Sequence, residues 1–157
     1  MKKGQPEPGD ARAARVTALD LLARRELPAG QLIERLERRG FSTDTAEAVA
    51  VALARENLVN DRRFVEMFIA SHAGRGQGPV RVRNDLRQAC VDPELIDEFI
   101  TAYGQWDTRA REARSKKFGS HVCDDYAEKA RQSRFLAYRG FTGAQIRAAL
   151  DFDPDDA

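Results

Sequence analysis

Residues 19–49 read LDLLARRELPAGQLIERLERRGFSTDTAEAV, and this stretch returns later in the chain with its hydrophobic positions retained. Fifty residues further on, residues 69–99 read IASHAGRGQGPVRVRNDLRQACVDPELIDEF. The shift places Leu36 on Leu86, although few residues are identical. Recurrence at a fixed interval is typical of repeat proteins, in which each copy is one supersecondary unit.

A third copy is predicted at residues 133–150, which read SRFLAYRGFTGAQIRAAL. A shift of 114 residues places Ile146 on Leu32 in this copy. The copy stops after its second helix. The second interval is 64 residues rather than 50, so we expect one extra helix, from near Asp107 to Gly119.

Each copy has the hydrophobic spacing of helices. Val16, Leu19 and Leu22, for example, recur every three residues. No stretch alternates in the manner of a strand over a useful length. We predict helix N-caps at Asp10, Asp44 (as a capping box with Glu47), Asp61, Gly78, Asp92 and the pair Asp124–Asp125. The fold class is therefore predicted to be all-α, with short three-helix units in series.

This pattern also predicts how the chain is divided. The predicted parts are a flexible N-terminal tail at 1–10, repeat 1 at 11–60, repeat 2 at 61–105, an inserted basic helix plus a truncated repeat 3 at 106–151, and an acidic tail at 152–157.

Charge is balanced overall but not along the chain. The 26 Lys and Arg stand against 25 Asp and Glu, so there is no global basic footprint. Residues 106–150, however, carry 10 basic and 5 acidic groups. The two cysteines, together with the lack of a long apolar run or a secretory leader, predict a cytoplasmic, monomeric protein with reduced thiols and no membrane segment.

The stretch GRGQGPVRVRNDL at residues 74–86 holds glycines and then arginines. It lacks the Lys-Ser/Thr of a Walker loop, and no strand precedes it, so it is not a Rossmann turn. Its glycines fit a connection between two helices. Its cations gather near a helix N-terminus and either suit an anionic partner or form a solvated face; they are Arg75, Arg81, Arg83 and Arg87.

A second basic cluster begins in RAREARSKKF at residues 109–118 and continues into the next helix. It is either the solvated face of an amphipathic helix or a surface that meets phosphate or acidic groups. The residues chosen as contacts are Arg111, Arg114, Lys116, Lys117, Arg131 and Arg134. The aromatic residues around it are predicted to lie in the core, namely Trp106, Tyr126, Tyr138 and Phe141.

The sequence offers no plausible set of catalytic residues. His72 and His121 are far apart in the chain. His121, Cys123 and Cys90 lack the spacing of a metal site, and no serine stands in a nucleophile elbow. We therefore predict no metal, no cofactor and no enzymatic activity.

Several stretches together resemble the RecX family, whose members regulate the RecA recombinase. Singly they are weak signals, but their order and spacing are fairly specific, and they span residues 14–150. The stretches are ALDLLARRELPAGQLIERLERRGF at 18–41, LVNDRRFVEMF at 58–68, GPVRVRNDL at 78–86, KKFG at 116–119 and RFLAYRGFTGAQI at 134–146.

The resemblance implies tandem three-helix repeats in an elongated, curved arrangement. It also implies a non-enzymatic protein that binds RecA and the RecA–DNA filament and inhibits recombinase, ATPase and co-protease activity; some members also bind DNA. Two departures concern helix ends: Pro28 stands where the family often has a capping Ser, and Cys90 replaces a common Gly. The alternative reading is a stand-alone helical DNA-binding protein.

Overall fold

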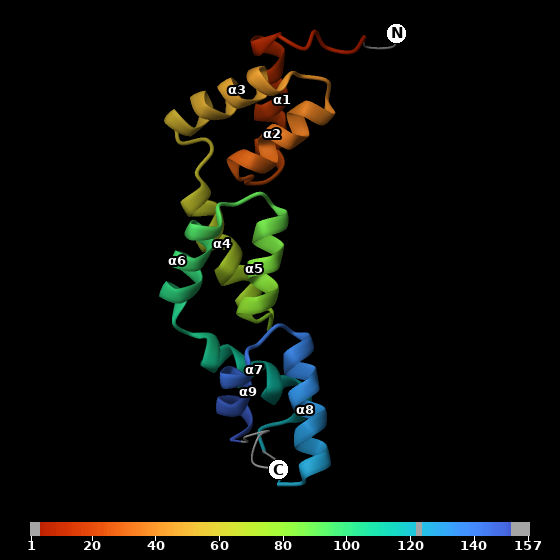
Figure 1. Ribbon diagram of the computed structural model, residues 1–157, viewed down its shortest axis with the longest axis vertical. Coiled ribbons are helices and arrows are strands. Elements are labelled where there is room, and N and C mark those ends of the chain that lie inside the picture. Colours follow the sequence, from red (N-terminus) through yellow and green to blue (C-terminus); the bar gives the residue numbers. More distant parts are fainter. Residues whose placement is uncertain (1–3, 122–123, 152–157) are drawn as a thin grey trace. The chain divides into compact units, whose positions relative to one another are not determined.

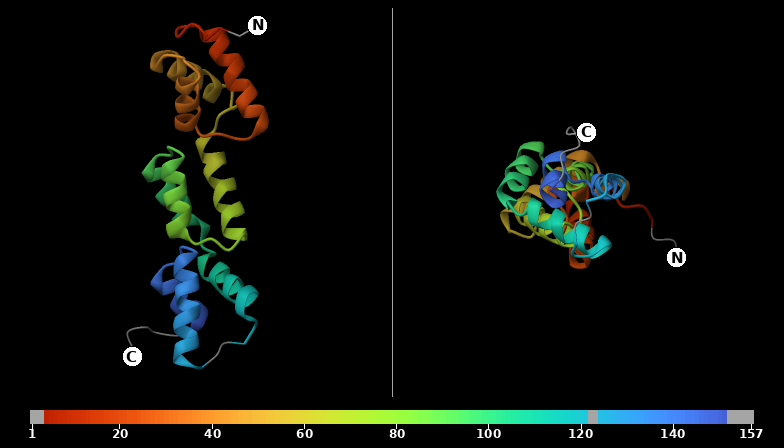
Figure 2. Two further views of the ribbon diagram at one scale, coloured as in Figure 1. Left: turned by 90° about the vertical axis from the view of Figure 1, so that its right-hand side faces the viewer. Right: turned by 90° about the horizontal axis from the view of Figure 1, so that it is seen from below.

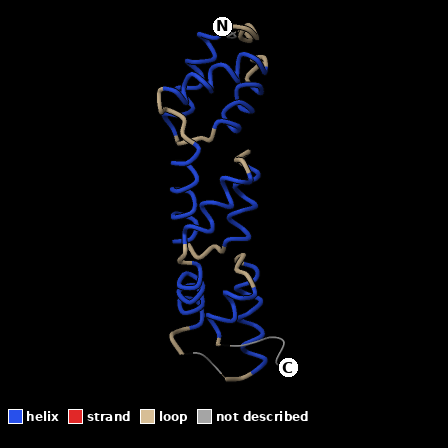
Figure 3. The backbone as a smooth tube through the Cα atoms, turned by 60° about the vertical axis from the view of Figure 1, so that its left-hand side comes forward, coloured by secondary structure: helices blue, strands red, loops and turns tan. Residues whose placement is uncertain are grey.

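The computed structural model describes residues 4–121 and 124–151, and within these ranges every regular element is a helix (Figure 3). The predicted all-α class is confirmed. The helices are α1 (Ala11–Arg24), α2 (Ala29–Arg38), α3 (Thr43–Arg55), α4 (Asp61–Gly74), α5 (Pro79–Gln88), α6 (Pro93–Tyr103), α7 (Trp106–Phe118), α8 (Tyr126–Tyr138) and α9 (Gly143–Leu150).

The chain divides into two compact units. The first unit holds the chain up to residue 65 together with residues 87–92, and the second holds residues 66–86 and the chain from residue 93 onward. In the described part of the chain, no helix is long and apolar enough to cross a membrane. The predicted acidic tail, residues 152–157, lies outside the described residues.

The core of the first unit lies among α1, α2 and α3 (Figure 1). Helix α3 packs against both others and supplies Ala46, Val49 and Leu53. Fully burying a large aliphatic side chain contributes about 1.5–3 kcal/mol to stability. Leu32 and Leu36 of α2 and Leu53 of α3, all completely buried, are therefore main anchors of this core.

In the second unit, α7 packs against both α8 and α9 (Figure 2). Ala110 of α7 is buried with Leu136 of α8 and Ile146 of α9. In the first unit, α1 likewise packs against α2 and α3. Helix α7 is therefore the first helix of a complete third three-helix repeat. The prediction of an inserted helix followed by a truncated copy is wrong.

The turn that follows the second helix of each copy sets the true register. Gly40, Cys90 and Gly140 stand 50 residues apart, with φ of 102°, 63° and 94°. All three adopt the left-handed conformation that ends helices, which favours glycine. The second interval is therefore 50 residues, and the predicted 64 is wrong because the third copy was aligned one helix out of register.

The residue after each of these turns is buried. Phe41 and Phe141 return to their units with 5% and 4% of their surfaces exposed, and Val91 takes the same place with 4%. The amides of Phe41 and Phe141 donate to the carbonyl oxygens of Leu36 and Leu136 at 3.2 and 3.1 Å. A hydrophobic residue that packs back in this way commonly accompanies such helix ends.

Two predicted caps are confirmed. Asp10 accepts from the amide of Ala13 at 3.0 Å, and Asp125 accepts from that of Glu128 at 3.0 Å. A third prediction is wrong, because Ser42 rather than Asp44 caps α3. Helix α3 begins two residues earlier than the predicted capping box requires.

Asp61 has a different role from the predicted one. Helix α4 begins at Asp61, but it is Asn60 that accepts from the amide of Arg63, at 3.0 Å. The Asp61 carboxylate instead accepts from the amide of Ala29 at 2.8 Å. Pro28 offers no side-chain cap to α2, and Asp61 instead accepts from the amide of the first residue of that helix, one of the amides that the helix leaves unpaired.

Candidate partner-binding surface

A cleft of about 310 Å³ opens in the second unit between the end of α4, the last turns of α7, and α8. Its backbone rim is Gly74 and Gly76, and Phe135 of α8 contributes an aromatic wall. Four cationic side chains line it, namely Arg75, Lys116, Lys117 and Arg139. We call these four residues and Phe135 the cationic cleft.

The lining of the cleft includes one carboxylate, Glu112, which is already engaged. Arg109 donates to Glu112 Oε2 at 3.0 Å and to Tyr103 Oη at 2.9 Å. These hydrogen bonds, the one to Tyr103 first, raise the pKa of Arg109. The positive charge that faces the cleft is therefore poorly compensated.

One aromatic ring, that of Phe135, lies beneath two of the cations. The guanidinium carbon of Arg139 lies 5.0 Å from the ring centroid of Phe135, and the Lys117 ammonium lies 6.0 Å from it. Both distances are within reach of a cation–π interaction. Arg139 also donates to the carbonyl oxygen of Arg75 at 3.4 Å. The charges are thus partly fixed in position before any ligand arrives.

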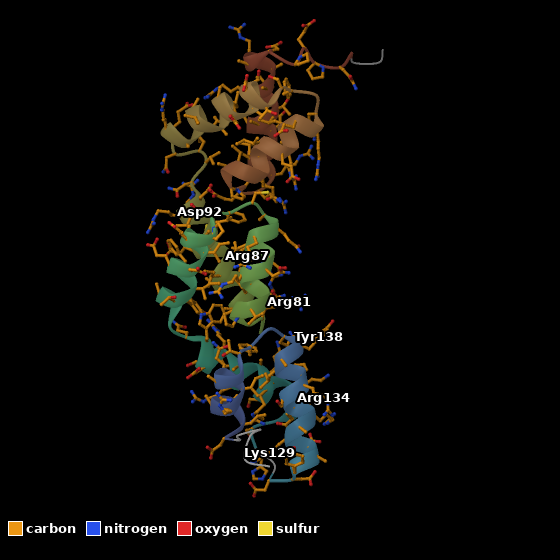
Figure 4. All side chains as sticks on the ribbon, viewed as in Figure 1. Arg81, Arg87, Asp92, Lys129, Arg134 and Tyr138 are labelled. Atoms are coloured by element: carbon orange, nitrogen blue, oxygen red, sulfur yellow. The ribbon has the colours of Figure 1, made fainter. Side chains whose placement is uncertain are left out.

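A second feature lies beside the cleft on α8. Tyr138 is 81% exposed, the highest value among the exposed large hydrophobic residues. Arg134, one turn earlier on α8, and Arg81 of α5 project on the same side of the second unit (Figure 4). Within the described chain the side chain of neither arginine has a hydrogen bond or ion pair. We call these three residues the Tyr138 face.

Backbone packing brings Arg81 to α8. The amides of Gly78 and Val80 donate to the carbonyl oxygens of Arg139 and Gly140 at 2.8 and 2.9 Å. A Cβ on Gly78 would overlap the Gly140 carbonyl group. The glycine before α5 therefore serves a close helix-to-helix contact, in agreement with its predicted place between two helices.

Comparison with known proteins adds a decisive observation. Family models described as the first, second and third three-helix domains of RecX match residues 14–50, 60–99 and 105–150. The chain belongs to the RecX family. The third of these domains spans α7, α8 and α9, as their mutual packing requires.

Relatives named RecX match most of the chain. "Regulatory protein RecX" of Halorhodospira halophila is 44% identical over 145 residues, which cover 92% of this chain and 90% of the relative. The protein of the same name from Pseudomonas fluorescens strain SBW25 is 36% identical over 146 residues, covering 92% and 94%.

A solved RecX structure has the same fold. The crystal structure of RecX from Lactobacillus salivarius matches with a TM-score of 0.80, covering 90% of this chain and 95% of that one. At 16% sequence identity this likeness shows the fold alone.

The structure joins residues from the two predicted contact clusters of this RecX chain. Arg75 of the first cluster shares the cationic cleft with Lys116 and Lys117 of the second. Arg81 of the first shares the Tyr138 face with Arg134 of the second. The two predicted patches are therefore better described as the cleft and the face.

Four other predicted contacts lie elsewhere. Arg83 forms an ion pair with Asp97 at 3.1 Å, Arg87 belongs to the first unit, and Arg111 is exposed on α7. Arg131 pairs with Glu128 at 2.8 Å and stands 5.1 Å above the ring of Phe118. The hydrogen bond from Arg131, and then that from Gln132, lower the pKa of Glu128.

Arg114 is a correction to the predicted surface. It is 3% exposed, and its guanidinium donates to oxygens inside the second unit. The acceptors are the carbonyls of Gly119 at 2.9 Å, Ser120 at 3.4 Å and His121 at 3.5 Å, and the side-chain oxygen of Gln132 at 3.4 Å. Its guanidinium holds the segment after α7 and is not part of the exposed basic surface.

The sequence interpretation missed Arg139 and Tyr138. Trp106 and Phe141 are buried as predicted, whereas Tyr126 and Tyr138 are exposed. The signal for an exposed Tyr138 is the 50-residue repeat. Two repeats place Tyr138 on Arg38, which is a surface position of α2.

A metal site has no support in the parts of the chain that the structure describes. In residues 4–121 and 124–151, no three His, Cys, Asp or Glu side chains gather in a way that could hold a metal ion. Cys123, a member of the alternative considered from sequence, lies outside these ranges.

Proposed function

We propose that this protein is a non-enzymatic regulator that binds RecA and the RecA–DNA filament and inhibits the filament's recombinase, ATPase and co-protease activities. Its role would lie in DNA repair and the SOS response. The observation that carries the proposal is family membership along nearly the whole chain, with relatives named regulatory proteins.

The geometry fits a binding role. The cationic cleft and the Tyr138 face present arginine, lysine and an exposed tyrosine on one unit. Tyr and Arg are enriched among the residues that dominate binding energy at interfaces. Guanidinium groups pair well with carboxylate and phosphate, the two anionic groups that a protein–DNA filament offers. Tandem units also supply several separate surfaces for neighbouring filament subunits.

Co-sedimentation with preformed RecA–DNA filaments tests this proposal. The chain should pellet with filaments and stay in solution with RecA-free DNA at the same salt concentration. In parallel, strand exchange should fall as the chain is added. Unchanged strand exchange at stoichiometric excess, with no pelleting, would overturn the proposal.

A second candidate function is DNA binding without RecA. The exposed Tyr138 between two unpaired arginines favours it, because single-strand binding combines positive grooves with aromatic stacking. Steep salt dependence of DNA binding in the absence of RecA would promote this reading. Weak binding with a shallow slope would leave it a minor activity.

A further inference from the structure

We propose that the turn at Gly40 is a docking surface for the start of α8 in a second copy of this chain, and that residues 6–8 cover this surface in the single chain. The inference goes beyond the proposed regulatory function, because it concerns contacts between copies of the chain and needs no RecA.

The first argument is a contact that occurs twice within the chain. In both cases the turn after the second helix of one repeat packs on the start of the second helix of the repeat before it. A Cβ on Gly30 of α2 would stand 2.7 Å from the carbonyl oxygen of Cys90. The amide of Val80 in α5 donates to the carbonyl oxygen of Gly140 at 2.9 Å. In this chain, such a turn is therefore a surface that accepts the start of a helix.

At the turn of the first repeat, residues 6–8 take the place of that helix. The carbonyl oxygen of Pro8 accepts from the amide of Ser42 at 2.8 Å, and a Cβ on Gly40 would stand 3.7 Å from Pro6 Cγ. Terminal segments of repeat proteins commonly close the series in this way. The closure is incomplete, since Gly40 is exposed where Gly140 is buried. We call residues 6–8 the N-terminal cover.

The start of α8 is the matching surface. Pro28 before α2 and Gly78 before α5 are buried, whereas Asp124, Asp125 and Tyr126 at the start of α8 are exposed. In the described part of the chain, α8 is thus a second helix whose start no later turn covers. Helix α8 begins about one turn earlier in its repeat than α5, so the amides of this extra turn are the ones that a docked turn would meet.

Charge complementarity favours this pairing. Arg38 and Arg39 stand directly before the turn of the first repeat and are exposed, while Asp124 and Asp125 stand directly before α8. Arg38 pairs with Glu34 at 3.1 Å, but the side chain of Arg39 has no ion pair or hydrogen bond within the described residues. Opposite charges on two surfaces steer their association and fix its register. Arg39 is therefore the cation that meets the two acids.

The N-terminal cover limits how far association can go. The turn and the start of α8 are different surfaces, so a contact between them is of the heterologous kind that repeats without closing. A chain with its cover in place should stay single, and a chain without it should add further copies.

The test is sedimentation velocity without RecA over a range of protein concentrations. Deletion of residues 2–8 removes the N-terminal cover and keeps Asp10, the N-cap of α1. The matched control, deletion of residues 2–5, keeps Pro6 and Pro8. Helical circular dichroism establishes that each variant folds. If the longer deletion does not fold, P6G/P8G loosens the cover within the full chain, because glycine frees the backbone that proline holds.

We expect the 2–8 deletion to reach an average mass of roughly twice that of the monomer or more as concentration rises, since the contact does not close. The parent and the 2–5 deletion should remain monomeric. Within the 2–8 deletion, R39E should abolish association and R39E/D124R should restore it in part. R24E, at an exposed position of α1, should leave it unchanged.

A folded 2–8 deletion that stays monomeric would overturn the proposal. So would association that ignores R39E, or equal association in the 2–5 deletion. Because RecA is absent from the experiment, each of these failures leaves the proposed regulation of RecA untouched.

Discussion

At the scale of the residue, the buried guanidinium of Arg114 holds the segment that follows α7 by hydrogen bonds. It lies within the second unit, and its acceptors are three backbone carbonyl oxygens and one side-chain amide. Because buried polar groups are costly to leave unpaired, removing Arg114 deprives the segment 119–121 of its donors. Sequence alone places Arg114 among neighbouring basic residues and gives it the same role as they have.

Replacing Arg114 by methionine should lower the free energy of unfolding by about 2–3 kcal/mol, since hydrogen bonds to a charged group are lost. Trp106, the single tryptophan, is buried on the same helix and reports the transition in urea by its fluorescence. The matched control R111M changes an exposed residue of α7 and should stay within about 0.5 kcal/mol. Equal effects of the two changes would refute the internal role.

Cys90 carries a second residue-scale prediction. It adopts φ 63°, where glycine is unstrained and other residues are not. The variant C90G should therefore raise the free energy of unfolding by roughly 0.5–1 kcal/mol. Adding a side chain at the equivalent position of the first repeat, G40A, should lower it by about 1 kcal/mol. Urea midpoints of the three proteins measure both effects. A destabilised C90G would show that the thiol makes contacts worth more than the strain.

At the scale of the element, backbone contact joins the start of α5 to the end of α8. Gly78 and Gly140 face each other so closely that a Cβ on Gly140 would stand 2.5 Å from that of Arg81. The same contact places Arg81 beside Tyr138 and therefore builds the Tyr138 face. Helix pairs that approach through glycine tolerate little added volume.

The variant G78A should therefore destabilise the second unit by about 1–3 kcal/mol, the usual cost of overpacking. Gly74 offers a matched control, because a Cβ there meets nothing within 4 Å and its φ is not positive. The variant G74A should melt within a few degrees of the parent. Thermal unfolding followed by circular dichroism compares them, and a G78A midpoint equal to that of G74A would contradict the close contact.

At the scale of the whole molecule, periodicity predicts the series of three-helix units because burial repeats with the helical turn. Leu36, Leu86 and Leu136, which stand 50 residues apart, are all buried as the repeat pattern requires. The candidate site is less accessible from sequence. Whether Arg114 points inward and Tyr138 outward depends on how α7 and α8 are rotated against α9, which tertiary packing decides. The register of the third copy is hard to read from the sequence because few of its residues are identical to those of the first.

The measurement that tests the account most directly is RecA ATP hydrolysis on single-stranded DNA, titrated with this chain at two salt concentrations. Substoichiometric inhibition is the predicted result, and it should weaken at higher salt because charged surfaces take part. It should weaken further in the variant R81E/R134E, which reverses two exposed and unpaired charges. Hydrolysis that stays unchanged at excess chain, at both salt concentrations, would contradict a role in regulating RecA.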